Sequence, residues 1–109
     1  MKAKLRTYSY KPKETKRGYL RVNGKFADEV WKTKNHRMFA MEISEGDEID
    51  ARGNYFGGGD GKSKWFAPWP QWVKIQFTDG KLRFFNYKDE EQTDLNWVEL
   101  ELIEEEVAV

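Results

Sequence analysis

The segment at residues 54–66 reads NYFGGGDGKSKWF, and its glycine run ends in Gly-Lys-Ser, as a phosphate-binding loop does. Such a loop also needs an earlier glycine at a fixed spacing and a helix after it, so that backbone N–H groups meet the phosphates. Here Phe56 occupies the position of that glycine, and the two prolines of KWFAPWPQW prevent a helix from following Ser63. The pattern instead predicts a loop between two strands, with Lys62 and Lys64 pointing outward.

The sequence singles out no group of residues as a catalytic centre, although its nineteen acids leave open a pair of carboxylates for glycoside cleavage. The chain contains no cysteine, and its single histidine, His36, lies in the polar stretch KTKNHR. Hydrolytic triads need a base beside a nucleophile, and zinc sites need several histidine or cysteine ligands. The acidic stretch EGDEID at 45–50 lacks the alternating ligand order of a calcium loop. We therefore expect a protein that is not an enzyme and that has no metal or cofactor.

Asp79-Gly80 is a preferred dipeptide for a two-residue hairpin turn, because both central residues of that turn need positive φ. A turn at this point determines which residues of WVKIQFT and KLRFFNY face each other. The predicted core side pairs Phe77 with Leu82, Ile75 with Phe84, and Val73 with Asn86. The opposite face combines rings, cations and an amide and has no carboxylate. Its pairs are Gln76 with Arg83, Lys74 with Phe85, and Trp72 with Tyr87.

This mixture of side chains is typical of surfaces that bind single-stranded nucleic acid. Bases stack on aromatic rings, for about 1 to 3 kcal/mol each, while Lys and Arg contact the phosphates. OB-folds and sheet-face RNA binders use strands in this way. The alternative is that the chain covers this face, which would then form a second core layer. The predicted nucleic-acid-binding residues are Trp72, Lys74, Gln76, Arg83, Phe85 and Tyr87 on the hairpin, Lys62 and Lys64 on the loop, and Lys11, Lys13, Lys16 and Arg17 near the N-terminus.

The net charge of zero conceals a separation of charge along the chain. Residues 1–37 carry twelve Lys/Arg and three Asp/Glu, which gives +9, while residues 38–109 carry seven and sixteen, which gives −9. We interpret the basic part, which includes Lys2, Lys4 and Arg6, as an arm that binds a polyanion. The alternative is that the two halves pair with each other, either within the fold or across a homodimer.

The stretch at residues 65–72 is a dense cluster of aromatic residues and proline. It predicts one wall of a peptide groove or an aromatic cage for a methylated lysine, which would make the chain a protein-interaction module, such as a small accessory or inhibitor protein. The alternative is a rigid crossover whose rings close one end of the core. The residues of this second candidate site are Trp65, Phe66, Trp69 and Trp72.

Two short stretches resemble known families. APWPQW is similar to the Pro-Trp-Trp-Pro signature of chromatin-reading barrels, although it places Pro70 and Gln71 between its tryptophans. KIQFTDGKLRFF resembles the central hairpin of Tudor-type domains. Both stretches are short and consist of common residue types, so we assign no family.

Segments with alternating apolar and polar residues must position these side chains. The alternation is present in FAMEI at 39–43, EIDARGNY at 48–55 and VELEL at 98–102, and a period of two is typical of strands with one buried face. Asn23-Gly24 predicts a second hairpin turn, and residues 27–42 also fit the spacing of a short helix. We therefore predict an all-β fold with at most one short helix, namely a small barrel or bent antiparallel sheet of OB-like or SH3/Tudor-like type.

A chain of 109 residues is long enough for one domain. We expect a basic arm or edge strand at residues 1–17 and a small β domain with an acidic C-terminal end at residues 18–109. Aromatic residues make up 16% of the chain, more than so small a core needs, so some rings are expected to face water or a ligand. The sequence starts without the apolar region of a secretory signal and has no run of about 20 apolar residues, so we expect a soluble cytoplasmic protein.

Overall fold

The computed structural model describes residues 1–10, 18–33, 36–54, 71–93 and 95–103. Within these residues the chain is all-β and has no helix, so the predicted all-β class is confirmed. The same part of the chain accordingly offers no helix that could span a membrane. The strands are β1 (Lys2–Tyr10), β2 (Tyr19–Val22), β3 (Lys25–Phe26), β4 (Glu29–Lys32), β5 (His36–Ser44), β6 (Ile49–Gly53), β7 (Gln71–Thr78), β8 (Lys81–Phe85), β9 (Glu91–Gln92) and β10 (Val98–Ile103).

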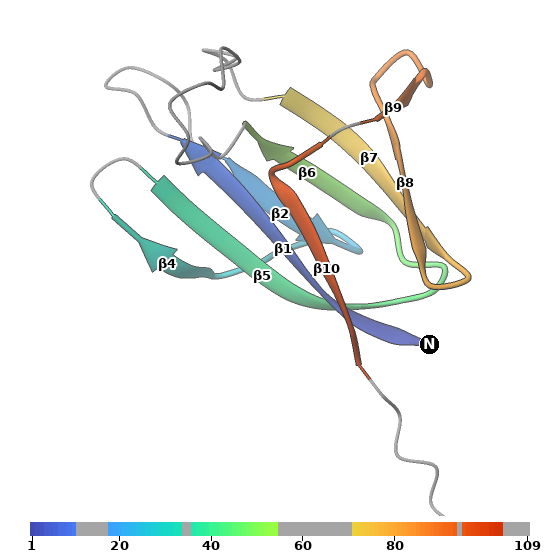
Figure 1. Ribbon diagram of the computed structural model, residues 1–109, viewed down its shortest axis with the longest axis horizontal. Coiled ribbons are helices and arrows are strands. Elements are labelled where there is room, and N and C mark those ends of the chain that lie inside the picture. The colour runs from blue at the N-terminus through green and yellow to red at the C-terminus, as the bar shows by residue number, and fades with distance from the viewer. Residues whose placement is uncertain (11–17, 34–35, 55–70, 94, 104–109) are drawn as a thin grey trace, which may run out of the picture.

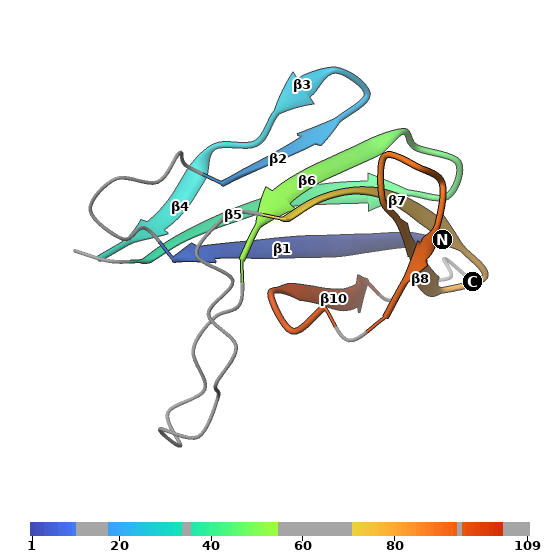
Figure 2. The same ribbon diagram turned by 90° about the horizontal axis from the view of Figure 1, so that it is seen from above.

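The strands form two antiparallel sheets (Figure 1). One sheet has four strands in the order β10-β1-β5-β4, and the other has six strands in the order β3-β2-β6-β7-β8-β9. Figure 2 shows β2, β6 and β7 of the larger sheet side by side. Buried side chains from both sheets share a single hydrophobic core, so each sheet has one face inside and one face toward solvent.

Both predicted hairpin turns are present. Asn23 and Gly24 connect β2 to β3 with φ of 50° and 82°, and Asp79 and Gly80 connect β7 to β8 with φ of 55° and 72°. The turn needs positive φ at both positions, which glycine adopts at no steric cost and which Asn and Asp tolerate. Local sequence therefore sets the register of the β7–β8 hairpin, which carries the candidate site.

The core lies between the sheets and is built from residues that alternate along the strands. In β7, for example, Val73, Ile75 and Phe77 are buried, while the residues between them are exposed. Trp97, just before β10, has the largest fully buried side chain among the described residues. Its ring lies so close to Gly53 that a Cβ at this position would be 2.5 Å from Trp97 Cε3. Glycine is therefore needed where β6 ends, because any side chain would displace this ring.

The strand β1 lies between β5 and β10 (Figures 1 and 2). Lys4 faces Glu101 of β10 on one side and Glu42 of β5 on the other. Arg6 forms an ion pair of 2.8 Å with Glu101. The basic start and the acidic end of the chain thus pair within the fold. The prediction of an arm or an edge strand is wrong for residues 2–10, because β1 is paired with β10 on one side and with β5 on the other. The sequence gives no local signal for this, because the acids that match the cations of β1 come from distant parts of the chain.

The stretch 27–42, which also fits a helical spacing, contains β4 and the greater part of β5. The connection between the two strands is closed by the backbone N–H of Thr33, which donates to the carbonyl of His36 at 2.8 Å. Pairing with β1 on the other side of β5 fixes the extended conformation. Tertiary contacts therefore decide a segment for which the local pattern is ambiguous.

Candidate nucleic-acid interface

The β7–β8 hairpin has the predicted register over most of its length. Its ladder contains four of the predicted pairs, namely Phe77 with Leu82, Ile75 with Phe84, Gln76 with Arg83, and Lys74 with Phe85. The first two pairs lie on the core side and the last two on the outer side. The outer face of the six-stranded sheet therefore presents Lys74, Gln76, Arg83 and Phe85 together, as expected from the turn at Asp79-Gly80.

The ladder ends at Phe85, so the predicted pairs of Val73 with Asn86 and of Trp72 with Tyr87 do not form. The chain turns away because the side-chain oxygen of Asn86 accepts hydrogen bonds from the backbone N–H groups of Lys88 (2.9 Å) and Glu90 (3.0 Å). Such short Asn side chains compete with a ladder for backbone groups. The turn moves Tyr87 away from Trp72 and leaves it 71% exposed.

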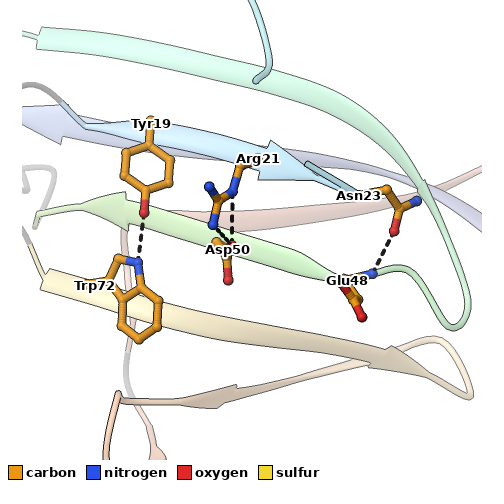
Figure 3. Close-up of polar contacts among 6 residues, drawn as sticks. All are labelled: Tyr19, Arg21, Asn23, Glu48, Asp50 and Trp72. Atoms are coloured by element: carbon orange, nitrogen blue, oxygen red, sulfur yellow. Dashed lines mark hydrogen bonds and ion pairs between the residues drawn. The ribbon is translucent and has the colours of Figure 1, made fainter. Parts of the chain in front are cut away.

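Trp72 is matched instead by residues on its other side. It faces Arg52 of β6, which in turn faces Tyr19 of β2. The Trp72 indole N–H donates a hydrogen bond of 2.7 Å to the Tyr19 hydroxyl (Figure 3). All three residues are half-buried, so two rings and a guanidinium group share one end of the outer face. Tyr19 and Arg52 are absent from the predicted site, because the pairing of β2 with β6 has no local signal in the sequence.

Cations lie over three aromatic rings of this region. Arg83 Cζ is 5.2 Å from the ring centroid of Phe85, which is half-buried. Lys88 Nζ lies 5.8 Å from the centroid of Tyr87, and Arg21 Cζ of β2 lies 5.7 Å from that of Phe26 in β3. These distances are within the range of about 6 Å over which the face of a ring attracts a cation. The rings are therefore held in place while part of their surface remains accessible.

The outer face also carries carboxylates, which the hairpin alone does not reveal. Lys74 Nζ forms an ion pair of 3.2 Å with Asp89 Oδ1, from the turn after β8. Arg83 donates to both carboxylate oxygens of Glu91 in β9, at 3.0 and 3.2 Å. The hydrogen bond from Arg83 and its positive charge hold the pKa of Glu91 below its ordinary value. The prediction of a face without carboxylates is thus wrong for the sheet, because neighbouring segments bring acids beside the hairpin's cations.

The paired strands β2 and β6 carry a further ion pair on the outer face. Arg21 donates to Asp50 through both its Nε and a terminal nitrogen (Figure 3). Arg52, one row further along, forms no ion pair with any of the described residues. Arg52 is therefore the cation on this face best placed to meet an added anion.

An open groove of about 810 Å³ lies over β6 and β7. Its charged lining residues are one cation, Lys74, and the four acids Asp47, Glu48, Asp50 and Asp89. The Asn23 side chain accepts a hydrogen bond of 2.9 Å from the Glu48 backbone N–H and so ties two turns together at the edge of the groove (Figure 3). The outer face is thus acidic at this end, whereas the end with Tyr19, Arg52 and Trp72 is aromatic and cationic.

The other predicted site residues lie outside the described residues. They are Lys11, Lys13, Lys16 and Arg17 in the first segment, and Lys62, Lys64, Trp65, Phe66 and Trp69 in the second. The first segment joins β1 to β2 just before Tyr19, and the second joins β6 to β7 just after Arg52 and before Trp72. Both segments are therefore attached to the aromatic and cationic end of the outer face.

The fold and the site define a small antiparallel β domain with an aromatic face toward solvent. Comparisons of this chain with protein-family models, curated proteins and solved structures find no match. The inference of function therefore depends on the chemistry of the described side chains.

Proposed function

We propose that this chain is a non-catalytic protein that binds single-stranded DNA or RNA on the outer face of the six-stranded sheet. The observation that carries the proposal is the placement of Trp72 and Phe85 on that face, both partly accessible and both beside a cation. The two rings come from neighbouring strands, so one strand of nucleic acid can contact both.

Stacking supplies the sequence-independent part of the binding. A base on an accessible ring gains about 1 to 3 kcal/mol, and Arg guanidinium planes stack on bases as well. Arg83 lies over Phe85 at 5.2 Å, so a base can stack on the guanidinium as an extension of the ring. Tyr87, which is 71% exposed, adds a third ring at the edge of the sheet.

To bind phosphates, the cations of this face must give up the carboxylates that they now contact. Lys74 and Arg83 have exposed side chains, and exposed ion pairs are worth only about 0 to 1 kcal/mol, so a phosphate can replace Asp89 or Glu91. Arg52 needs no such exchange with the described residues. Further Lys and Arg residues of the sequence belong to segments 11–17 and 55–70, which lie outside the described residues. The cysteine-free sequence supports a cytoplasmic location.

Tryptophan fluorescence tests this proposal, with short single-stranded DNA and RNA oligonucleotides added at low and at moderate NaCl. We expect quenching at low salt and a loss of affinity at moderate salt. A plot of log affinity against log salt concentration should have a slope of about −0.7 for each phosphate that the protein neutralises. Lys74→Glu with Arg83→Glu should weaken binding at least about tenfold, because two contacts become repulsive. Lys32→Glu, on the other sheet, is the charge-reversal control and should leave binding unchanged.

The absence of quenching at low salt would reject nucleic-acid binding. Equal affinity of the parent and the double variant would show that another surface binds the oligonucleotide.

A second candidate function is a protein-interaction module, and the acidic groove over β6 and β7 favours it. The excess of carboxylates there repels phosphate and attracts Lys or Arg side chains of a peptide. Trp72 belongs to both candidate sites, whereas Trp65, Phe66 and Trp69 lie outside the described residues. The two functions respond in opposite directions to the removal of acids from the outer face, as argued below.

A further inference from the structure

A small pocket lies on the outer face of the four-stranded sheet, and thus on the opposite side of the core from the candidate nucleic-acid interface. Its volume is about 290 Å³, and it is lined by Tyr8, Trp31, Met38, Asn96 and Glu99. Ligand pockets usually range from about 300 to 1,000 Å³, so this one is suited to a single head group. We propose that the pocket binds a methylated ammonium group.

Three lining residues form one row across neighbouring strands. Tyr8 of β1 and Trp31 of β4 are both paired with Met38 of β5, which lies between them. Adjacent strands are about 4.8 Å apart, so the backbones that carry the two aromatic residues are about 9.6 Å apart. A cation above Met38 would lie between the Tyr8 and Trp31 side chains, and the face of an aromatic ring attracts a cation within about 6 Å. The sheet therefore spaces the rings for a cation between them.

Glu99 supplies a negative charge at the Tyr8 end of the pocket. The Tyr8 hydroxyl donates a hydrogen bond of 2.8 Å to Glu99 Oε2. Burial, and then this hydrogen bond, raise the pKa of Tyr8, which keeps the phenol protonated as a donor. Arg6, the residue opposite Glu99 on β1, directs its guanidinium to Glu101. None of the described cations forms an ion pair with Glu99, so a cationic ligand would complete the site.

The Trp31 ring is also positioned from outside the pocket. His36 stacks on it with a centroid distance of 6.4 Å and an interplanar angle of 22°. His36 does not belong to the pocket lining. The stacking therefore orients the indole and does not occupy the space beside Met38.

The acceptors in the pocket favour a methylated ammonium over other cations. A Lys ammonium carries three N–H donors and an Arg guanidinium five, and each donor needs an acceptor. Only the side chains of Glu99 and Asn96 offer strong acceptors among the described lining residues. A quaternary ammonium has no N–H group, and its methyl groups contact rings and the Met38 thioether favourably. Either a small quaternary amine or a methylated lysine of another protein carries this head group.

Methyl NMR of the methionines tests the proposal directly. The chain has three methionines, of which Met38 lines the pocket while Met1 and Met41 do not. Tetramethylammonium chloride is titrated against NaCl at equal ionic strength and against tert-butanol, a neutral molecule of similar shape. We expect a saturable shift of the Met38 methyl signal with tetramethylammonium alone, and no shift of Met1 or Met41. An unmoved Met38 signal, or an equal shift with tert-butanol, would overturn the proposal.

Variants assign the effect to the pocket. Trp31→Leu should weaken tetramethylammonium binding about fivefold and Trp31→Phe by less, since phenylalanine keeps a ring. Glu99→Gln should weaken binding at least about threefold while still accepting the Tyr8 hydrogen bond. Glu42→Gln removes a carboxylate from the same face outside the pocket and should have no effect. Unchanged Met1 and Met41 signals show that each variant is folded, and unchanged affinity in folded Trp31→Leu and Glu99→Gln would refute the assignment.

Choline and a peptide with trimethyllysine then distinguish the two sources of the head group. Tighter binding of the peptide than of choline indicates contacts beyond the pocket and thus a protein ligand, whereas equal binding indicates a small amine. The oligonucleotide experiment concerns the other sheet, so either proposal can fail while the other stands.

Discussion

Three cations on the outer face of the six-stranded sheet are each paired with a carboxylate, whereas Arg52 forms no ion pair with a described residue. Lys74 is paired with Asp89, Arg83 with Glu91, and Arg21 with Asp50. The side chains of Lys74 and Arg83 are 49% and 57% exposed, so solvent screens these ion pairs and weakens them. A bound phosphate competes with carboxylates that are already in place. At Lys74 and Arg83, the gain in affinity from a phosphate is therefore only the difference between the new contact with phosphate and the lost contact with a carboxylate.

Removal of the competing acids should strengthen nucleic-acid binding. We expect Asp89→Asn with Glu91→Gln to raise affinity for a single-stranded oligonucleotide about threefold to tenfold, because Lys74 and Arg83 no longer exchange one anion for another. The same variant should weaken binding of a Lys-rich peptide. Fluorescence titrations with both ligands measure the two effects. Glu90→Gln, in the same turn but not ion-paired with a described cation, is the control. A loss of oligonucleotide affinity in the double variant would favour the protein-interaction function.

The Arg83–Glu91 pair also predicts a pH dependence. Arg83 lowers the pKa of Glu91 in the folded chain. The pair therefore stabilises the fold above the pKa of the unfolded chain, and this contribution is lost as the pH falls through the lowered pKa. Arg83→Gln should raise the pKa of Glu91 toward the ordinary value of a glutamate, as measured by NMR titration of the side-chain carboxyl. An unchanged pKa in the variant would mean that Arg83 does not hold this carboxylate in solution.

At the scale of elements, local signals predict both hairpin turns and several individual strands, but not which distant strands pair. Asp79-Gly80 sets the turn, and alternation separates the buried from the exposed residues of β7, so four cross-strand pairs follow from the sequence. The end of the ladder at Phe85 also has a local signal, namely Asn86. Its side-chain oxygen accepts hydrogen bonds from the backbone N–H groups of Lys88 and Glu90, and an Asn at such a position favours a turn. The Tyr19–Arg52–Trp72 row had none, because it joins three strands that are distant in sequence.

The pairing of β1 with β10 can be tested by exchanging charges. Arg6 and Glu101 form an ion pair of 2.8 Å, and Glu99 also lies beside β1. Arg6→Glu alone should lower the free energy of unfolding, because like charges then face each other across the strands. Adding Glu101→Arg should restore a part of the loss. Urea unfolding of the two single variants and the double variant measures the coupling. Additive effects would show that the two side chains do not interact.

At the scale of the whole molecule, the two sheets present different surfaces. The outer face of the larger sheet has partly accessible rings beside cations and an acidic groove, while the described part of the smaller sheet has strands of opposite charge side by side and a small pocket. Alternation and turn dipeptides predicted the all-β class, and the 16% aromatic content predicted that some rings face water or a ligand. These signals did not predict that the basic N-terminal segment is an interior strand, because the sequence order of charges carries no information on which strands become neighbours.

Chemical-shift mapping of the tryptophan indole N–H groups with a single-stranded oligonucleotide at low salt tests the nucleic-acid proposal most directly. The chain has five tryptophans, of which Trp72 lies on the proposed interface, Trp97 is fully buried, and Trp31 lies on the other sheet. We predict a saturable shift of the Trp72 signal, with Trp97 and Trp31 unchanged. A Trp72 signal that does not move at saturating oligonucleotide, or a shift confined to Trp31, would contradict binding at the outer face of the six-stranded sheet.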